Sequence, residues 1–279
     1  MHPFWSVGFC LAALVHAEPS STTVLVTGAT GRTGSLAYLK FKDLVDLSPG
    51  FEVRGLVRNV TKAQERLKCL KCDETEGPRA KWDLEFSKRE LFVFLIYIGV
   101  FCIKPSYPID IDYKGCINQV REAMNHGVSQ VIHRYFINFD EFRISSKIPW
   151  LVQIILVSSF GTTKPENPND PMSTGHVLLY KLNAEASLMG SGLDFTIIKP
   201  AGLVSTPGGK NLLLIGQQDS CMQEGLFSIS REDLADVCVQ AVLNTDISRG
   251  LRFDLVSDPS KPATGDLKAL LQSAQKNRI

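Results

Sequence analysis

The chain has 279 residues, a length that suits one large domain or two small ones. Its composition, with 44% hydrophobic and 21% charged residues and a net charge of +1, is typical of a globular protein. Basic residues form no run or stripe, so neither nucleic acid nor a strongly acidic surface is expected as a partner.

The first 20 residues have the pattern of a targeting segment. Phe4 to Ala17 is mostly apolar, and Val15-His-Ala17 resembles a small-residue cleavage site for a secretory signal. The segment lacks the Lys or Arg that normally precedes such an apolar run, so a docked N-terminal extension is the alternative. The run is too short for a stable membrane span. The folded domain is therefore predicted over residues 22–279.

A glycine-rich turn near the start of the domain is the strongest chemical signal. The apolar, β-branched run Val24 to Thr27 predicts a strand, and the apolar spacing in Ser35 to Val45 predicts a helix. Between them lies a G-x-x-G-x-x-G turn. Such a turn brings backbone N–H groups and the positive end of a helix dipole to an anion, which predicts a dinucleotide phosphate site. Its expected cofactor contacts are Gly28, Thr30, Gly31, Arg32, Thr33 and Gly34.

The next predicted strand, within residues 50–59, ends on Arg58. In a doubly wound sheet, the end of the second strand lies beside the adenosine ribose. An acidic residue there binds the 2′-hydroxyl of NAD, whereas a basic residue accommodates the 2′-phosphate of NADP. Arg58 therefore favours NADP over NAD, with Arg32 and Lys62 as possible helpers. The alternative is that Arg58 is a solvated surface side chain.

Strands and helices alternate along the rest of the chain, although residues 69–90 show no clear pattern. Helices are predicted at 61–67, 109–126, 177–190, 230–242 and 266–275, and strands at 194–198 and 251–256. Residues 91–103 contain no charged side chain, and such a run favours a strand buried on both faces. The alternatives are an apolar membrane segment and an artefact of the gene model. This alternation predicts a doubly wound parallel α/β sheet in a single domain.

A strand beginning at Val128-Ser-Gln-Val-Ile132 is followed by a stretch of no single period. Strand character resumes at Ile155-Leu-Val-Ser158. Joining Ile132 directly to Leu156 would give one uninterrupted strand. Residues 133–154 are therefore predicted to be an insertion, and both this segment and residues 69–104 could be retained intron sequence.

The seven cysteines include one C-x-x-C pair, Cys69 and Cys72. A zinc site would require a second pair or suitably spaced histidines, and the sequence offers neither, so no metal site is predicted. Ordinary thiols are the favoured interpretation, with redox or disulfide chemistry as the alternative.

Several motifs occur along the chain: the glycine turn, Gly55-Leu-Val-Arg58, Asp112-Tyr-Lys-Gly-Cys-Ile-Asn118, Ser158-Ser, Lys181-Leu-Asn-Ala-Glu185, Ser191 to Pro200, Gly209 to Gly216 and Ser230 to Cys238. Together they resemble the atypical short-chain dehydrogenase/reductases, and more narrowly their NmrA-like, plant and plastid NAD(P)-binding group. The resemblance covers residues 22–68, 107–132 and 155–275. It implies a Rossmann-like domain that binds NADP.

The resemblance also identifies candidate catalytic residues, Ser158 and Lys181. Typical members of the superfamily pair a serine with Tyr-x-x-x-Lys, in which the tyrosine is the general acid/base. Here Val177 stands where that tyrosine would be, and Tyr180 lies about 100° round the helix from Lys181. Ser158 and Lys181 are therefore expected to contact the cofactor ribose or substrate without a complete proton relay. Glu185 is expected to pair with Lys181 at i,i+4.

Two functions remain open from the sequence. The first is hydride transfer from NADP(H) to a small carbonyl, quinone or flavin-like acceptor, with the proton taken from solvent. The second is a non-catalytic NADP(H) sensor that docks a redox partner protein. An epimerase is disfavoured because the tyrosine is absent. The targeting segment and the plastid resemblance predict a plastid protein reached by the secretory route, with a cytoplasmic form as the alternative.

Overall fold

The computed structural model describes residues 21–47, 50–57, 60–67, 90–97, 109–127, 151–166, 176–221 and 225–275. The predicted targeting segment 1–20, the strand start at 128–132 and the Cys69–Cys72 pair lie outside these residues. All further structural statements concern the described part of the chain.

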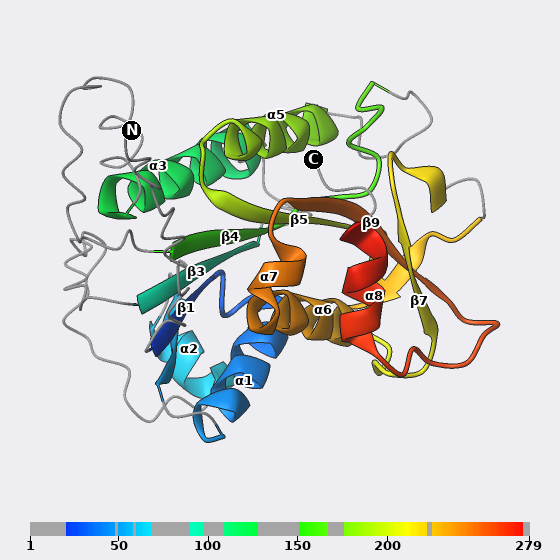
Figure 1. Cartoon of the computed structure of the whole chain (residues 1–279), viewed down its shortest axis with the longest axis horizontal. Helices are drawn as coiled ribbons and strands as arrows, with labels where there is room; N and C mark the ends of the chain where they lie inside the picture. Colours follow the sequence, from blue (N-terminus) through cyan, green and yellow to red (C-terminus); the bar gives the residue numbers. More distant parts are fainter. Residues whose placement is uncertain are drawn as a thin grey trace, which may run out of the picture.

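A seven-stranded sheet forms the centre of the molecule (Figure 1). Its order is β2-β1-β3-β4-β5-β9-β7, and every neighbouring pair is parallel except β7 and β9. The strands are β1 (Ser21–Thr27), β2 (Phe51–Leu56), β3 (Glu90–Tyr97), β4 (Leu151–Val157), β5 (Asp194–Pro200), β7 (Leu212–Gly216) and β9 (Leu251–Asp258). A separate parallel pair is formed by β6 (Gly202–Val204) and β8 (Ser228–Ser230).

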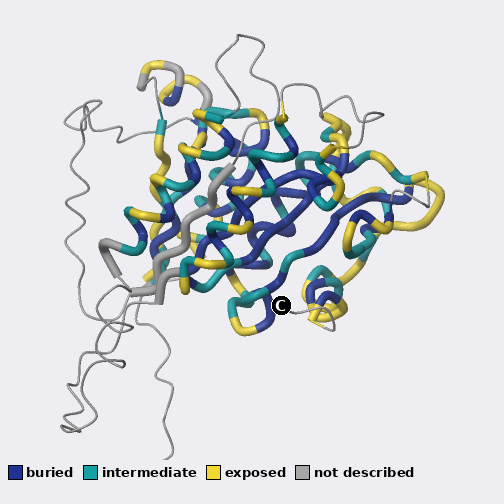
Figure 2. The backbone as a smooth tube through the Cα atoms, turned by 90° about the horizontal axis from the view of Figure 1, so that it is seen from above, coloured by how far each residue is buried: buried dark blue, intermediate teal, exposed yellow. Residues whose placement is uncertain are grey.

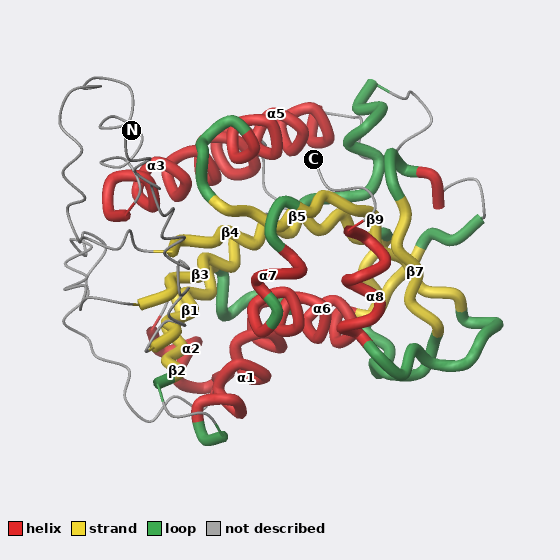
Figure 3. The backbone as a smooth tube through the Cα atoms, in the orientation of Figure 1, coloured by secondary structure: helices red, strands yellow, loops and turns green. Residues whose placement is uncertain are grey.

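Helices cover both faces of this sheet (Figures 1 and 3). One face carries α1 (Gly34–Val45), α2 (Val60–Leu67), α6 (Arg231–Leu243), α7 (Thr245–Ser248) and α8 (Leu267–Ala274). The other carries η1 (Ile109–Gly115), α3 (Cys116–Gly127) and α5 (Val177–Met189). The predicted doubly wound parallel sheet is thereby confirmed, whereas the antiparallel β7 and the β6–β8 pair were not predicted.

The continuous apolar run of β4 is explained by burial on both faces. Buried backbone likewise gathers in the interior of the molecule, with exposed residues on its outer segments (Figure 2). Ile155 and Val157 pack into the cluster beneath α1 and α6, while Ile154 and Leu156 pack beneath α3 and α5. Because successive strand side chains point to opposite faces, a strand between two helical layers needs apolar residues at every position.

The strand predicted to resume at Ile155 begins earlier, within the predicted insertion 133–154, and the insertion itself stays a prediction. β4 begins at Leu151 and pairs with β3 from that residue onward. Gln153 is 1% exposed, and its amide nitrogen donates to Thr196 and Ser248, so this polar side chain is accommodated within the sheet. Residues 133–150 lie outside the described chain.

The structure also gives the outcome for the predicted strand at 91–103 and the predicted helix at 109–126. The strand expected within residues 91–103 is confirmed for β3, which lies between β1 and β4. In the described part of the chain, no helix is both long and apolar enough to cross a membrane. The helix predicted at 109–126 begins as a π-helix, η1, rather than as an α-helix. Such widened turns are rare and frequently lie at functional sites.

The strand order places a ligand site at the end of β1. From β1 the chain moves outward to β2, and β3 then pairs on the opposite side of β1. Dinucleotides bind at the carboxyl ends of strands where the order reverses in this way. The glycine turn follows β1 directly, and therefore lies at that point.

Candidate functional site

The glycine turn has the backbone geometry of a phosphate cradle. Gly28 has φ +66°, which disfavours any side chain, and its carbonyl accepts from the Gly31 N–H at 2.8 Å. A Cβ on Gly34 would lie 2.3 Å from that same carbonyl oxygen. The turn therefore brings the start of α1 against the end of β1, and α1 has no acidic residue in its first turn to occupy the positive end of its dipole. These residues fit a cofactor phosphate.

Arg32 extends from this turn to a segment far along the sequence. Its guanidinium donates to Ser205 Oγ at 2.7 Å, and Arg231, at the start of α6, donates to the same oxygen at 3.0 Å. A hollow of about 220 Å³ lies here, lined by Arg32, Leu36, Ser205, Thr206, Arg231 and Glu232. Two guanidinium groups and hydroxyls are a donor set suited to an anion. The hollow is smaller than a typical ligand pocket, so it can hold only part of a dinucleotide.

Of the other predicted cofactor contacts, the two threonines of the turn are described and the residues after β2 are not. Thr33 is buried at the N-cap of α1, and Thr30 is half-buried within the turn. Arg58 and the side chain of Lys62 lie outside the described residues. The contribution of Arg58 to cofactor choice therefore stays a prediction.

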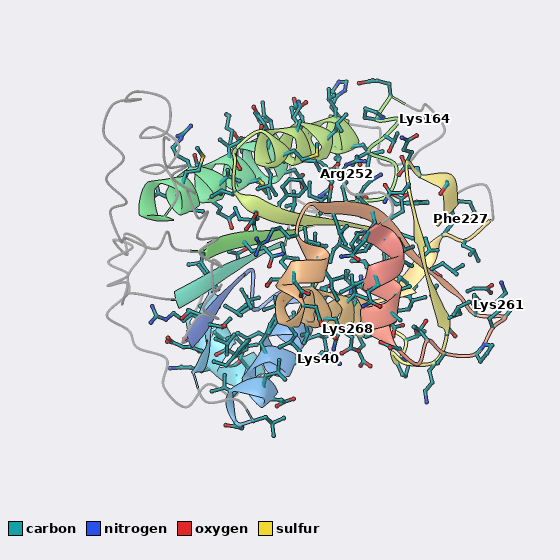
Figure 4. All side chains as sticks on the ribbon, viewed as in Figure 1. Lys40, Lys164, Phe227, Arg252, Lys261 and Lys268 are labelled. Atoms are coloured by element: carbon teal, nitrogen blue, oxygen red, sulfur yellow. The ribbon has the colours of Figure 1, made fainter. Side chains whose placement is uncertain are left out.

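Ser158 and Lys181, the candidate catalytic residues, are both buried, Ser158 at the end of a central strand and Lys181 in α5. Ser158 follows β4 and is 1% exposed, and its hydroxyl donates to Glu185 Oε1. Arg252, labelled in Figure 4, binds the other oxygen of Glu185 through Nε at 2.8 Å and Nη2 at 2.7 Å. Glu185 thus joins β4 to β9 in addition to facing Lys181, which corrects the expectation of a simple i,i+4 pair.

Lys181 is fully buried and forms an ion pair across the helical layer. Its Nζ lies 2.8 Å from Asp112 Oδ1 in η1. Burial raises the pKa of Asp112, and the nearby ammonium only partly offsets this rise. Burial likewise lowers the pKa of Lys181, against the opposing effect of Asp112. The two groups therefore approach one another in proton affinity.

A second buried lysine closes the same edge of the sheet. Lys199 Nζ, at the end of β5, lies 2.7 Å from Asp219, 2.9 Å from Asp254 and 3.1 Å from Thr163 Oγ1. Asp219 also accepts from the backbone N–H groups of Gly161 and Thr163. The Lys199 ammonium thus lies within 3.1 Å of three oxygens, and these contacts link β5, β9 and the two loops.

The pKa shifts within this cluster have opposite signs. Burial raises the pKa of Asp254, although Lys199 opposes the rise. Burial acts the same way on Asp219, but its hydrogen bonds to Lys199, Gly161 and Thr163 outweigh burial and leave its pKa lowered.

Metal and thiol chemistry find no support among the residues that the structure describes. No group of three or more His, Cys, Asp or Glu side chains there is placed to hold a metal ion. The cysteines described there as free thiols, Cys116, Cys221 and Cys238, are buried, and burial raises the pKa of Cys116 to about 12.

Known proteins resemble this chain over most of its length. An uncharacterised chloroplast protein of Arabidopsis thaliana is 30% identical, covering 95% of this chain and 78% of its own. The sanguinarine reductase of Eschscholzia californica is also 30% identical, covering 89% of this chain and 94% of its own. The family model described as NAD(P)H-binding matches residues 151–245. The chain is an atypical short-chain dehydrogenase/reductase of the NAD(P)H-binding family.

Solved structures agree with this fold. A candidate NAD-dependent epimerase/dehydratase from Bacillus halodurans superposes with a TM-score of 0.59 at 23% identity, covering 90% of this chain and 99% of that one. The oxidoreductase ylbE from Lactococcus lactis gives 0.58 at 17% identity, covering 92% and 98%. Family membership supports a nicotinamide cofactor for this chain.

Within this family member, sequence reasoning missed most of the buried charges. The Asp112 motif was recognised, but nothing in its spacing indicated contact with Lys181. Asp254 interrupts an apolar strand, which is a signal of a buried polar partner. Arg231 and Ser205 carried no signal, because their proximity to Arg32 depends on the loop that leads into α6.

Proposed function

We propose that this chain is an NADP(H)-dependent oxidoreductase that transfers hydride to a small carbonyl, quinone or flavin-like acceptor. The observation that carries the proposal is the glycine turn at the switch point of the sheet, with Arg32 beside it. The relative named sanguinarine reductase adds support for redox chemistry on this fold. The cofactor, when bound, would supply the hydride.

Some residues of the chain would bind the cofactor, and others would position the groups around it. Gly28, Gly31 and Gly34 would hold the phosphates by their backbone, and Arg32 with Arg231 would add charge. NADP rather than NAD is proposed because these guanidiniums, together with the predicted Arg58, favour an additional phosphate. Ser158 and Lys181, being buried, would act as positioning residues.

Plastid residence is proposed with the activity. Relatives from Arabidopsis thaliana and rice are described as chloroplastic. A fusion of residues 1–40 to a fluorescent protein tests this proposal, with plastid fluorescence as the expected result. The hydride acceptor is proposed to be either a small molecule or a redox partner protein.

The test is oxidation of NADPH by the purified protein with a panel of aldehydes, quinones and flavins, followed at the reduced nicotinamide band. Turnover with at least one acceptor, and a lower KM for NADPH than for NADH, is expected. Saturable binding of NADPH without turnover over the whole panel would contradict the proposal that this chain is an enzyme. It would instead favour the second candidate, a non-catalytic NADP(H) sensor, which the burial of Ser158 and Lys181 supports.

A further inference from the structure

We propose that Ser205 and Arg231 form the second wall of a phosphate site whose first wall is the glycine turn. This wall rests on the proposed cofactor-dependent function, and it gives Ser205 a binding role. The two walls meet at Ser205 Oγ, which accepts from Arg32 of the turn, 173 residues earlier in the chain, and from Arg231 of α6. The hollow of about 220 Å³ beside this contact would hold the phosphate group.

The two guanidinium groups are held close together around one neutral oxygen. Their nitrogens lie 2.7 Å and 3.0 Å from Ser205 Oγ, so these nitrogens are less than about 6 Å apart. Within the described ranges, Arg32 forms no ion pair with a carboxylate. Like charges at this separation repel one another, and a phosphate group between them replaces that repulsion with two attractions.

The Ser205 hydroxyl is oriented by the same two contacts. A hydroxyl has one donor and two acceptor positions, and the guanidinium groups occupy both acceptor positions of Ser205. Its O–H must therefore point away from them, and in the part of the chain that the structure describes it donates to no protein atom. Accepting from two cations also polarises the O–H bond, which makes it a stronger donor. An oxyanion is the acceptor that suits such a group.

The second wall is held in place before any ligand binds. Residues 205–209 are fastened to the start of α6, because Ser230 Oγ donates to the Thr206 carbonyl at 2.7 Å and the Gly208 N–H donates to Glu232 Oε2 at 2.8 Å. Glu232 is the acidic residue of the lining, and this backbone contact engages one of its carboxylate oxygens. A wall that is already ordered loses little conformational entropy when a phosphate binds.

The experiment is isothermal titration of the purified protein with NADPH, NADH and inorganic pyrophosphate. Ser205→Ala and Arg231→Met should each weaken binding of at least one of these ligands by about tenfold, the scale of a hydrogen bond to a charged group. Ser205→Thr keeps the hydroxyl and should restore the parent affinity. Glu232→Gln removes a negative charge but keeps an acceptor for the Gly208 N–H, so it should tighten binding by about threefold.

Matched controls remove the same groups away from the hollow. Ser273→Ala removes an exposed hydroxyl that donates within its own helix, and Arg249→Met removes a guanidinium that pairs with Asp194. Both variants should bind all three ligands as the parent protein does. Ser205 is exposed, so Ser205→Ala keeps the test usable if Arg231→Met unfolds.

The pattern of the loss identifies which phosphate occupies the hollow. Equal losses for NADPH and NADH assign it to the cofactor diphosphate, a loss for NADPH alone assigns it to the 2′-phosphate, and a loss for pyrophosphate alone assigns it to a free phosphate ligand.

Unchanged affinity for all three ligands in Ser205→Ala, or the same loss in the control variants, would overturn the phosphate site. A parent protein that binds none of the three would overturn both the site and the proposed function. Binding of NADPH that depends on Ser205, without turnover by any acceptor, would contradict the proposed function alone.

Discussion

The carboxyl edge of the sheet has two regions built on different physical principles. At the end of β1, the glycine turn relies on backbone N–H groups and on the exposed Arg32. Beside the ends of β4 and β5 and the first half of β9, the charged side chains are buried and hold one another in pairs and triads. The first region is arranged to meet an external anion, and the second is arranged to keep its own charges fixed. An open region and a region of paired charges are thus separated along one edge.

The most damaging change to the binding region is a methyl group at Gly34. In Gly34→Ala, the new Cβ would meet the Gly28 carbonyl at 2.3 Å, so the turn must open. NADPH affinity should fall by more than about 100-fold, with a loss of about 1–3 kcal/mol in unfolding free energy from overpacking. Fluorescence titration and thermal melts measure the two effects. Gly265→Ala, where a Cβ meets nothing within 4 Å, should leave both unchanged.

The largest effect in the positioning region should come from Lys199→Met. Removing the ammonium leaves Asp219 and Asp254 as two buried carboxylates without their cation, at a cost of about 3–5 kcal/mol. Denaturant unfolding checks this. Lys261→Met provides the control, because Lys261 is exposed and its pair with Asp258 should contribute less than about 1 kcal/mol. Equal losses in the two variants would contradict the distinction between buried and surface pairs.

A smaller effect is expected when the charge beside the turn is removed. Arg32→Met should weaken NADPH binding by about tenfold, since a hydrogen bond to a charged group contributes about 1.5 kcal/mol or more. Unfolding free energy should barely change, because Arg32 is exposed. Arg54→Met is the control, as Arg54 pairs with Glu52 on the exposed strand β2. Isothermal titration at two salt concentrations should show a weaker salt dependence in Arg32→Met alone.

The pH dependence of stability should separate two aspartates of one cluster. The pKa of Asp219 is lowered on folding, so its contribution is present above pH 3.8 and is lost as the pH falls below it. The pKa of Asp254 is raised, so the folded state binds more protons just above pH 3.8 and stability falls as the pH rises there. Melting temperatures measured from pH 3 to 7 should show both effects. In Asp219→Asn, the decrease in melting temperature toward acid pH should disappear. In Asp254→Asn, the decrease in melting temperature toward neutral pH should disappear. The same pH profile in both variants would show that the pKa values of Asp219 and Asp254 are not shifted in opposite directions.

The fold was predictable from the sequence because its signals are local. Apolar runs such as β4 and the glycine turn with its flanking strand and helix carry their periodicity in consecutive residues. Ser230 at the start of α6 was recognised in the same way, and its hydroxyl accepts from the Glu232 N–H. The start of β4 at Leu151 was missed because Trp150 and Pro149 precede it in a stretch without a period.

The buried charges were not predictable in the same way. Lys181 and Asp112 are 69 residues apart, and Arg252 and Glu185 are 67 apart. Sequence pattern gives a residue's face on its own helix or strand, but not which distant charge faces it. Lys181 was therefore expected beside a ligand, and the structure places it against Asp112 instead.

Direct titration with NADPH tests the central claim, that the glycine turn holds the cofactor. Saturable enhancement of nicotinamide fluorescence is expected for the parent protein and for Gly265→Ala, and it should be abolished in Gly34→Ala at the same protein concentration. Absence of saturable binding in the parent protein, or equal binding by a folded Gly34→Ala, would contradict the account.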